Sequence, residues 1–175
     1  MSSVPIWIRA AVFLILFPGA IAGWIPWYIH SPQPDAPSMH QLGLPLVAIG
    51  WGVLLWCARD FARRGRGTPA PYDPPRALVT DGLYRFVRNP MYVGVLLAVL
   101  GLALWWWSRS VLIYAVGVAI AFHLRVLMYE EPRLTQSFGA DFAQYRARVP
   151  RWLPRLGKGG NANTTLKTPT EKGRQ

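Results

Sequence analysis

The sequence predicts an all-α, multi-pass membrane protein with four transmembrane helices and a C-terminal amphipathic helix on the cytoplasmic side. Three observations predict this class. Charged residues make up only 15% of the 175 residues and hydrophobic types 52%, whereas soluble globular proteins carry about 25% charged residues. Mean hydropathy is positive, at +0.19. The basic residues, which give a net charge of +11, avoid the long apolar runs.

Four apolar runs, extended by their flanks, are long enough to cross a bilayer as helices. They are Ala10–Ile29, Leu42–Ala58, Met91–Trp107 and Val111–Tyr129, the last interrupted only by a His and an Arg. A helix rises about 1.5 Å per residue, so about 20 residues cross a hydrocarbon layer of about 30 Å. The first run has a signal-peptide alternative, with a small-residue cleavage site at residues 20–22. The run continues past that site, which favours a retained span.

The distribution of Lys and Arg predicts the orientation. Residues 59–90 contain seven arginines, and residues 133–174 contain nine basic residues. Residues 30–41 contain none, and the link at 108–110 contains one. Because basic residues are enriched in cytoplasmic loops, we expect both termini and the middle loop on the cytoplasmic side. This placement favours an anionic bilayer surface over nucleic acid as the partner.

The third and fourth runs are joined only by residues 108–110, which predicts a tight antiparallel hairpin. Its two polar ends are therefore expected at the same membrane face. Small residues recur four apart in both runs, Gly94 with Ala98 and Gly117 with Ala121. They indicate either a close approach of these two helices or ordinary Gly and Ala usage in membrane helices.

Apolar side chains recur at helical spacing after the fourth run. They are Leu134, Phe138, Phe142, Tyr145 and Val149. This stripe predicts a short amphipathic helix that lies on the cytoplasmic interface or caps the bundle, ended by Pro150 and Pro154. We expect residues 1–156 to form one transmembrane domain, with its motifs in residues 76–154. The polar residues 157–175 are expected to be a disordered tail.

The motif content excludes several kinds of site. A single cysteine, Cys57, excludes a disulfide framework and a cysteine-cluster metal site, and we expect no metal. No phosphate-binding glycine loop occurs. His123 is interpreted first as a packed histidine bonded to a neighbouring helix, and second as a functional group. Arg125 needs a partner, either Glu130, Glu131 or an anionic ligand, unless it reaches the lipid headgroups.

Two motifs at the ends of the hairpin resemble the signature of integral-membrane methyltransferases, the group that includes isoprenylcysteine carboxyl methyltransferases and phospholipid methyltransferases. The first is Leu78-Val79-x-x-Gly82-x-Tyr84-x-x-x-Arg88-Asn89-Pro90-x-Tyr92. The second begins at Glu130-Glu131 and ends at Val149-Pro150-Arg151. The resemblance covers residues 76–154, almost half of the chain. The first two runs match only in hydrophobicity.

The resemblance implies methyl transfer from S-adenosylmethionine, bound without a Rossmann domain, to a lipidic or membrane-embedded acceptor. It assigns Glu130 a catalytic role and makes Arg125 the nearest candidate for orienting the acceptor. The family usually has His where this chain has Asn89, and Asn cannot titrate. The residues that the resemblance assigns to the cofactor are Arg76, Ala77, Leu78, Val79, Tyr84, Arg88, Asn89, Pro90, Met91, Tyr92, Glu130 and Glu131.

The acceptor stays open at this point. An isoprenylcysteine-type carboxylate is favoured, because it is already a nucleophile and needs only a cationic group such as Arg125 to orient it. A phospholipid amine must first lose a proton, and a thiol needs a charge that stabilises the thiolate. Two other functions are alternatives: an NADPH-dependent membrane reductase resembling the much longer sterol reductases, and a non-enzymatic membrane scaffold.

Overall fold

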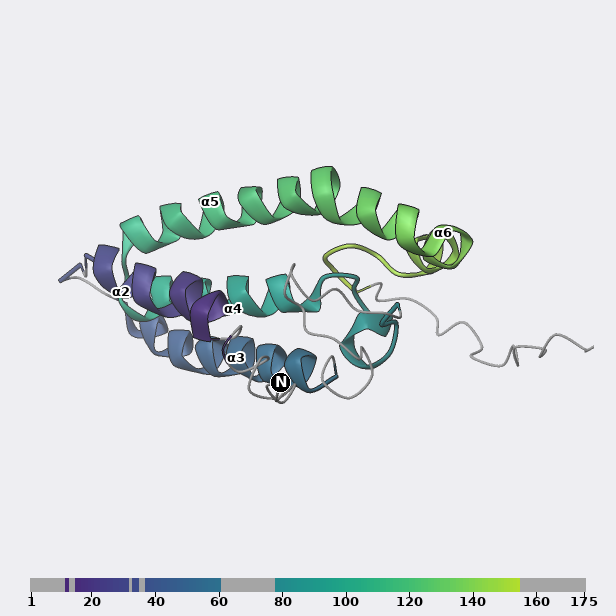
Figure 1. The fold of residues 1–175 in the computed structure, drawn as a ribbon. Coiled ribbons are helices and arrows are strands. Elements are labelled where there is room, and N and C mark those ends of the chain that lie inside the picture. The colour runs from purple at the N-terminus through teal and green to yellow at the C-terminus, as the bar shows by residue number, and fades with distance from the viewer. Residues whose placement is uncertain (1–11, 13–14, 32, 35–36, 61–77, 155–175) are drawn as a thin grey trace, which may run out of the picture.

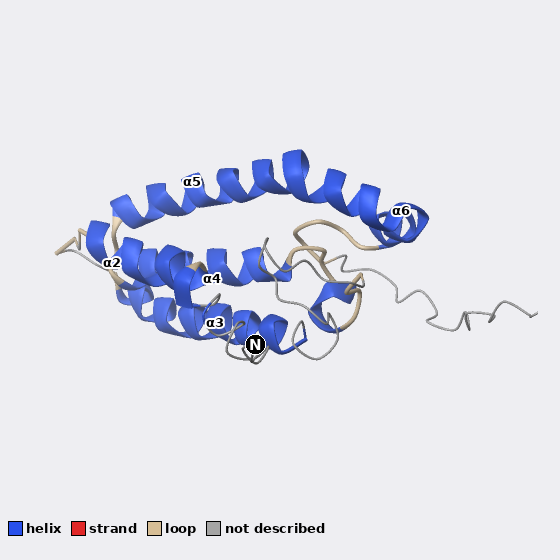
Figure 2. Cartoon of the chain, viewed as in Figure 1, coloured by secondary structure: helices blue, strands red, loops and turns tan. Residues whose placement is uncertain are grey.

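The computed structural model describes residues 12, 15–31, 33–34, 37–60 and 78–154, and all regular elements in this part are helical (Figures 1 and 2). The N-terminal helix includes a π-helical turn, η1 (Ala20–Trp24), and α2 (Ile25–Ile29). A 3-10 turn, η2 (Ser38–Leu42), leads into α3 (Gly43–Asp60). The predicted disordered tail lies outside the described residues.

The hairpin predicted from the short link is confirmed. A 3-10 turn, η4 (Gly82–Arg85), precedes α4 (Pro90–Trp105), which has Pro90 in its first turn, where a missing N–H costs nothing. Then α5 (Arg109–Arg125) returns beside α4 (Figure 1). The start of α4 and the end of α5 therefore meet at one end of the molecule, and Trp105 lies at the other end.

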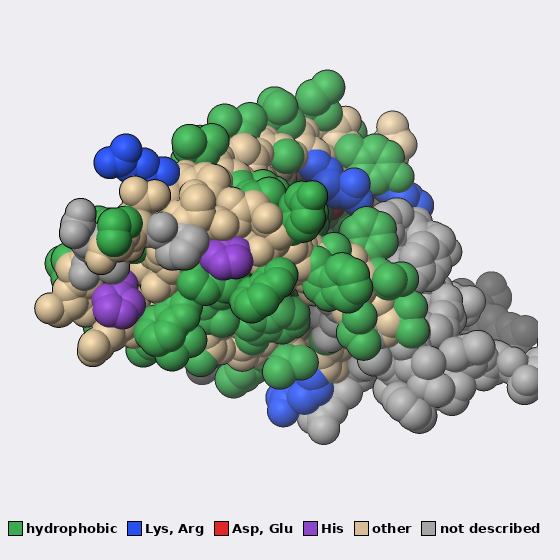
Figure 3. Space-filling view, turned by 90° about the vertical axis from the view of Figure 1, so that its left-hand side faces the viewer, with side chains coloured by type: hydrophobic (Ala, Val, Ile, Leu, Met, Phe, Trp, Pro, Cys, Tyr) green, Lys and Arg blue, Asp and Glu red, His purple; other side chains and the backbone are tan. Residues whose placement is uncertain are grey.

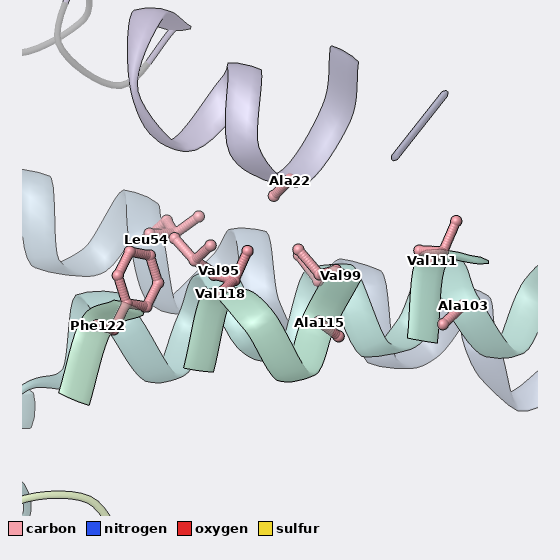
Figure 4. Close-up of a cluster of buried hydrophobic side chains, with 10 residues drawn as sticks. Ala22, Leu54, Val95, Val99, Ala103, Val111, Ala115, Val118 and Phe122 are labelled. Carbon is pink, nitrogen blue, oxygen red and sulfur yellow. The ribbon is translucent and has the colours of Figure 1, made fainter. Parts of the chain in front are cut away.

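Helix α4 is the central element. It contacts α3, α5 and the N-terminal helix. The core lies between these helices, and Figure 4 shows part of it. Its fully buried members, at 0% exposure, include Leu54 of α3, Val99 of α4 and Val111 of α5. Burial of these aliphatic side chains fixes how the two arms of the hairpin face each other.

The close helix approach is between α3 and α4. A Cβ atom built on Gly50 would lie 2.6 Å from the carbonyl oxygen of Gly94, and one on Gly43 would lie 2.5 Å from that of Gly101. In the described part of the chain, no atom beyond the surrounding turns of α5 lies within 4 Å of a Cβ on Gly117. The interpretation of Gly117 as a contact of the hairpin is therefore wrong, and the small residues of α4 serve the approach of α3 instead.

The predicted amphipathic helix is present but continues directly from α5. A π-helical turn, η5 (Val126–Glu130), joins α5 to α6 (Glu131–Arg148). Within α6 the backbone breaks at Gly139, where φ is 47°, a conformation that glycine adopts without a steric penalty. The apolar stripe turns inward, since Phe142 is only 2% exposed. The basic residues Arg146 and Arg148 lie in its last turn.

Two of the helices are long and apolar enough to cross a membrane, Ser38–Asp60 and the apolar part of Arg109–Arg148. Ala20–Ile29 and Pro90–Trp105 are apolar but shorter, so the expectation of four spans stays a prediction. Large apolar side chains cover much of the outer surface (Figure 3). Trp24 is 82% exposed and Ile113 is 72% exposed. Such a surface fits contact with lipid rather than water.

Candidate active site

A three-residue polar network joins the two ends of the hairpin. The hydroxyl of Tyr92, in the first turn of α4, donates to Oε1 of Glu130. Nε of Arg125 donates to the Tyr92 hydroxyl and to the same Oε1, at 3.0 Å in each case. Of the partners expected for Arg125, Glu130 is the one that the structure places beside it. The Arg125 side chain is 44% exposed, so the network lies open at one side.

Glu131 belongs to a second, more buried cluster. Its Oε1 accepts from Nη1 of Arg88 at 2.9 Å and from Nε of Arg151 at 2.8 Å. Nη2 of Arg151 also donates to Oε2 at 3.0 Å. Burial opposes ionisation of Glu131, but the two guanidinium groups outweigh it and hold the pKa of its carboxyl below the usual value. The adjacent acids thus have different partners.

The segment after α6 folds back over the site. The backbone N–H of Arg88 donates to the carbonyl of Pro150 at 2.9 Å, and Nδ2 of Asn89 donates to that of Arg151 at 3.2 Å. These contacts place Trp152 beside Tyr92, with ring centroids 6.5 Å apart. The other neighbour of the Tyr92 ring is Phe122, stacked on it at 4.3 Å. The Tyr92 ring therefore has two aromatic neighbours, one from α5 and one from the segment after α6.

Tyr84 lies beneath this region and is 8% exposed. Its carbonyl accepts from the hydroxyl of Tyr145 at 2.6 Å, which ties the segment before α4 to α6. Burial raises the pKa of the Tyr84 phenol well above its ordinary value, and the neighbouring Cys57 and Glu130 raise it further. Burial likewise raises the pKa of Tyr145 to about 12. Both phenols therefore stay protonated at neutral pH.

The structure brings most of the predicted site residues to one end of the hairpin. The start of α4 is flanked by Tyr84 and Asn89 and includes Pro90 and Tyr92. The start of α6 includes Glu131, and Glu130 precedes it. Met91 packs against the hydrophobic core. Leu78 and Val79 precede η4, while Arg76 and Ala77 lie outside the described residues. Among the residues described, no group of three or more His, Cys, Asp and Glu side chains is placed to hold a metal ion.

Sequence reasoning missed two groups near this end. Trp152 was not singled out, although it follows directly on the second motif. Asp60, at the end of α3, is 3% exposed, and its Oδ2 has no hydrogen-bond partner in the described part of the chain. A Cβ on Gly82 would lie 2.1 Å from that oxygen. An acid that ends an apolar run was the available signal for Asp60.

Comparison with known protein families shows which family domain contains this end of the hairpin. A family model described as phospholipid methyltransferase matches residues 38–141, which include α3, both arms of the hairpin and Glu130. The chain belongs to this methyltransferase family. The match spans Tyr92, Arg125 and Glu130, so the polar network lies inside the family domain.

Of three similar proteins, two are named methyltransferases and one is named for metal resistance. The cobalt-zinc-cadmium resistance protein CzcN of Cupriavidus metallidurans is 35% identical over 126 residues, which cover 71% of this chain and 51% of that protein. The protein-S-isoprenylcysteine O-methyltransferase of Schizosaccharomyces pombe is 37% identical over 78 residues, 44% of this chain and 33% of that protein. Protein-S-isoprenylcysteine O-methyltransferase A of Arabidopsis thaliana is 27% identical over 145 residues, 81% of this chain and 66% of that protein. The chain thus spans a third to two thirds of the length of these relatives.

Proposed function

We propose that this protein transfers a methyl group from S-adenosylmethionine to a lipidic acceptor, at the end of the hairpin where Tyr92, Arg125 and Glu130 meet. Family membership supports the reaction type. The observation that supports the place is the unused bonding capacity of the network. Both hydrogen bonds to Glu130 fall on Oε1. In the hydrogen bonds found among the described residues Arg125 uses only Nε, and its guanidinium group lies 5.5 Å from the centroid of the Tyr129 ring, so its Nη groups remain available as donors.

The free groups fit the donor. S-adenosylmethionine supplies a sulfonium methyl group, and it carries a positive charge, an ammonium group and ribose hydroxyls. Glu130 Oε2 is a carboxylate oxygen suited to accept from an ammonium or a hydroxyl group. We assign the remaining donor contacts to Leu78, Val79, Tyr84 and Asn89, with Arg76 and Ala77 before them.

Arg125 is assigned to the acceptor. Its guanidinium group is held at Nε by Tyr92 and Glu130, which fixes the direction of the two Nη groups. A fixed guanidinium group binds a carboxylate through two parallel N–H donors. The two isoprenylcysteine methyltransferases among the relatives are named for such an acceptor. We therefore favour an isoprenylcysteine-type carboxylate over a phospholipid amine or a thiol.

Few side chains need to take part in the chemistry. Methyl transfer from a sulfonium is an in-line displacement, in which the acceptor oxygen forms a bond to the methyl carbon as the carbon–sulfur bond breaks. The protein has to align the two partners and keep water out. Glu130 holds the donor and Arg125 holds the acceptor. The segment after α6, with Trp152, covers the site from the side of the bulk solvent, which we assign to the cytoplasm.

Incubation of membranes containing the protein with radiolabelled S-adenosylmethionine tests the reaction. Label is expected in the lipid or prenylated fraction, and it is expected to be lost with Glu130→Gln. No label in either fraction would contradict the proposal. NADPH binding to the purified protein without binding of S-adenosylhomocysteine would instead support the reductase alternative. Unchanged labelling with Glu130→Gln would remove Glu130 from the site.

A further inference from the structure

The structure gives His123 a defined partner next to the proposed site. Nε1 of Trp152 donates to Nδ1 of His123 at 3.2 Å, and the two ring centroids are 6.1 Å apart. An indole N–H is only a donor, so Nδ1 is the accepting nitrogen. A neutral imidazole then carries its proton on Nε2. His123 is exposed, and its Nε2–H has no partner among the described residues. It therefore presents an oriented donor at the edge of the site.

Trp152 is held firmly in this place. Two hydrogen bonds anchor the segment that carries Trp152. The Arg88 N–H donates to the carbonyl of Pro150, and Asn89 donates to the carbonyl of Arg151. The ion pair between Arg151 and Glu131 adds a third anchor. The Arg88–Glu131–Arg151 cluster thus holds the Trp152 indole in position, and the indole N–H determines which nitrogen of His123 accepts.

His123 and Arg125 lie on opposite flanks of α5. Residues two apart on a helix are about 200° apart, and buried Phe122 and Val126 face inward between them. The N-terminal helix packs only against the first half of α5 on the Arg125 flank, and Arg125 itself is 44% exposed. Tyr114, three turns before Arg125 on that flank, donates to the carbonyl of Ile21 at 3.1 Å.

The His123 flank is open. Val116, Ile120 and Leu127, at helical spacing from His123, are 55%, 57% and 40% exposed. None of the described helices packs over them, because the contacts of α5 are with α4, η5 and the N-terminal helix. An apolar flank that ends in a polar N–H donor at the membrane boundary matches a lipid with a polar head group.

We propose that the Trp152–His123 pair forms the side of the site through which the lipidic methyl acceptor enters. In this assignment, which rests on the proposed function, the Nε2–H group of His123 donates to an oxygen of the acceptor head group other than the methylated one. Trp152 packs beside the acceptor, and Arg125 binds the reacting carboxylate from the other flank. His123 and Trp152 are positioning residues for the acceptor and have no role in binding the donor.

Two matched probes test this assignment by binding rather than turnover. N-acetyl-S-farnesylcysteine has a carboxylate and an amide carbonyl, and S-farnesylthiopropionic acid has the same carboxylate without the amide. Binding of each probe to the purified, full-length protein is measured by calorimetry, with and without S-adenosylhomocysteine. Wild type is expected to prefer the amide-bearing probe by about fivefold, the value of one added hydrogen bond.

The variants separate the two sides of the site. His123→Ala is expected to abolish the preference between the probes and leave the affinity for S-adenosylhomocysteine within about twofold of wild type. Trp152→Ala is expected to weaken both probes about tenfold, through lost packing. Trp152→Phe keeps an aromatic ring at this place, so the structure is preserved, but it removes the N–H donor. It is expected to lose only part of the preference for the amide-bearing probe. Trp24→Phe, a change at an 82% exposed indole in the N-terminal helix, is the matched control and should change nothing.

The outcomes distinguish this inference from the proposed function. Wild type that binds neither probe, or His123→Ala with an unchanged preference, overturns the inference. Equal losses of donor and probe affinity with Trp152→Phe also overturn it, because they indicate a general structural role. Wild type that fails to bind S-adenosylhomocysteine contradicts the proposed function, while the probe measurements without it still test the entry side.

Discussion

Glu130 and Glu131 are adjacent in sequence and have different partners. Glu130 is partly exposed, shares one oxygen with Tyr92 and Arg125, and keeps the other available. Glu131 is saturated by two arginines. Exposed ion pairs contribute at most about 1 kcal/mol to the free energy of unfolding. A buried acid that loses its partners lowers that free energy by about 3–5 kcal/mol. We therefore assign Glu130 to function and Glu131 to stability.

At Arg125, replacement with Ala is expected to reduce turnover about 100-fold, because the acceptor loses its orienting charge. The bond between Tyr92 and Glu130 does not need Arg125, so the affinity for S-adenosylhomocysteine should stay within about threefold. Methyl transfer and calorimetry on the same preparation measure the two effects. Arg109→Ala, at the far end of the hairpin, is the control. Equal loss of both quantities would argue against a role with the acceptor.

The Glu131 cluster predicts a dependence of stability on acid. The pKa of Glu131 is lower in the folded protein than in the unfolded chain, so the folded state binds fewer protons. Its contribution is therefore complete above the unfolded pKa of about 4.3 and is lost as the pH falls through the lower, folded value. The thermal midpoint of wild type should therefore be constant down to about pH 4.3 with respect to this group and drop as the pH falls below that value.

Glu131→Gln supplies the comparison for this prediction. The variant is expected to be less stable by about 3 kcal/mol at pH 7, since two guanidinium groups lose their counter-charge. Its thermal midpoint should respond less to acid than that of wild type. Equal acid responses in the two proteins would show that other carboxyl groups control the effect.

The sequence predicted which residues lie at the candidate site, but only some of the contacts between their side chains. The apolar setting of Arg125 predicted a carboxylate partner, and Glu130 is that partner. The sequence placed Tyr92 and Glu130 in one site, but the direct hydrogen bonds from Tyr92 and Arg125 to the same carboxylate oxygen depend on the register of the hairpin. Trp152 was missed for a related reason: only the fold brings the segment after α6 back to His123.

At the scale of elements, the approach of α3 to α4 depends on a lack of side chains. Gly50→Ala would place a Cβ 2.6 Å from the backbone oxygen of Gly94, so the helices must separate. We expect a loss of about 1–3 kcal/mol in the free energy of unfolding. Gly52 lies on the same helix, and no described residue outside the surrounding turns comes within 4 Å of its Cβ. Gly52→Ala should therefore stabilise by about 0.5–1 kcal/mol.

Denaturation of both variants in the same detergent checks this pair of expectations. Equal effects of Gly50→Ala and Gly52→Ala would indicate that helix propensity, rather than helix packing, determines the result. The pair also avoids the site, because both residues lie in the middle of α3, away from η4 and the polar network.

Sequence patterns predicted where the helices lie in the chain better than which helices pack against each other. The four apolar runs and the hairpin link located the helices, since hydrophobicity and chain length constrain them directly. The stripe of small residues could not show which helix packs on it, and α3, not α5, takes that place. The π-helical turn η5 was not predicted either, because its extra residue leaves no signal in the apolar pattern.

For the whole molecule, the account requires the turn of the hairpin and the site at its polar ends to face opposite sides of the membrane. Gln33 lies with the turn near Trp105, and Leu153, 78% exposed, lies with the site. Cysteine at either position is suited to labelling, because native Cys57 is fully buried. In sealed right-side-out vesicles, a membrane-impermeant maleimide should label Gln33→Cys at once and Leu153→Cys only after permeabilisation. Labelling of Leu153→Cys in intact vesicles would contradict the predicted cytoplasmic location of the site.

The central claim is that the two ends of one helical hairpin together bind the methyl donor. Calorimetric titration of the purified, folded protein with S-adenosylhomocysteine, compared between wild type and Glu130→Gln, tests it most directly. We expect binding to wild type, and at least about tenfold weaker binding to the variant, since a charged hydrogen bond is lost, with an unchanged thermal midpoint. Absence of binding to folded wild type, or equal affinity in the two proteins, would contradict the claim.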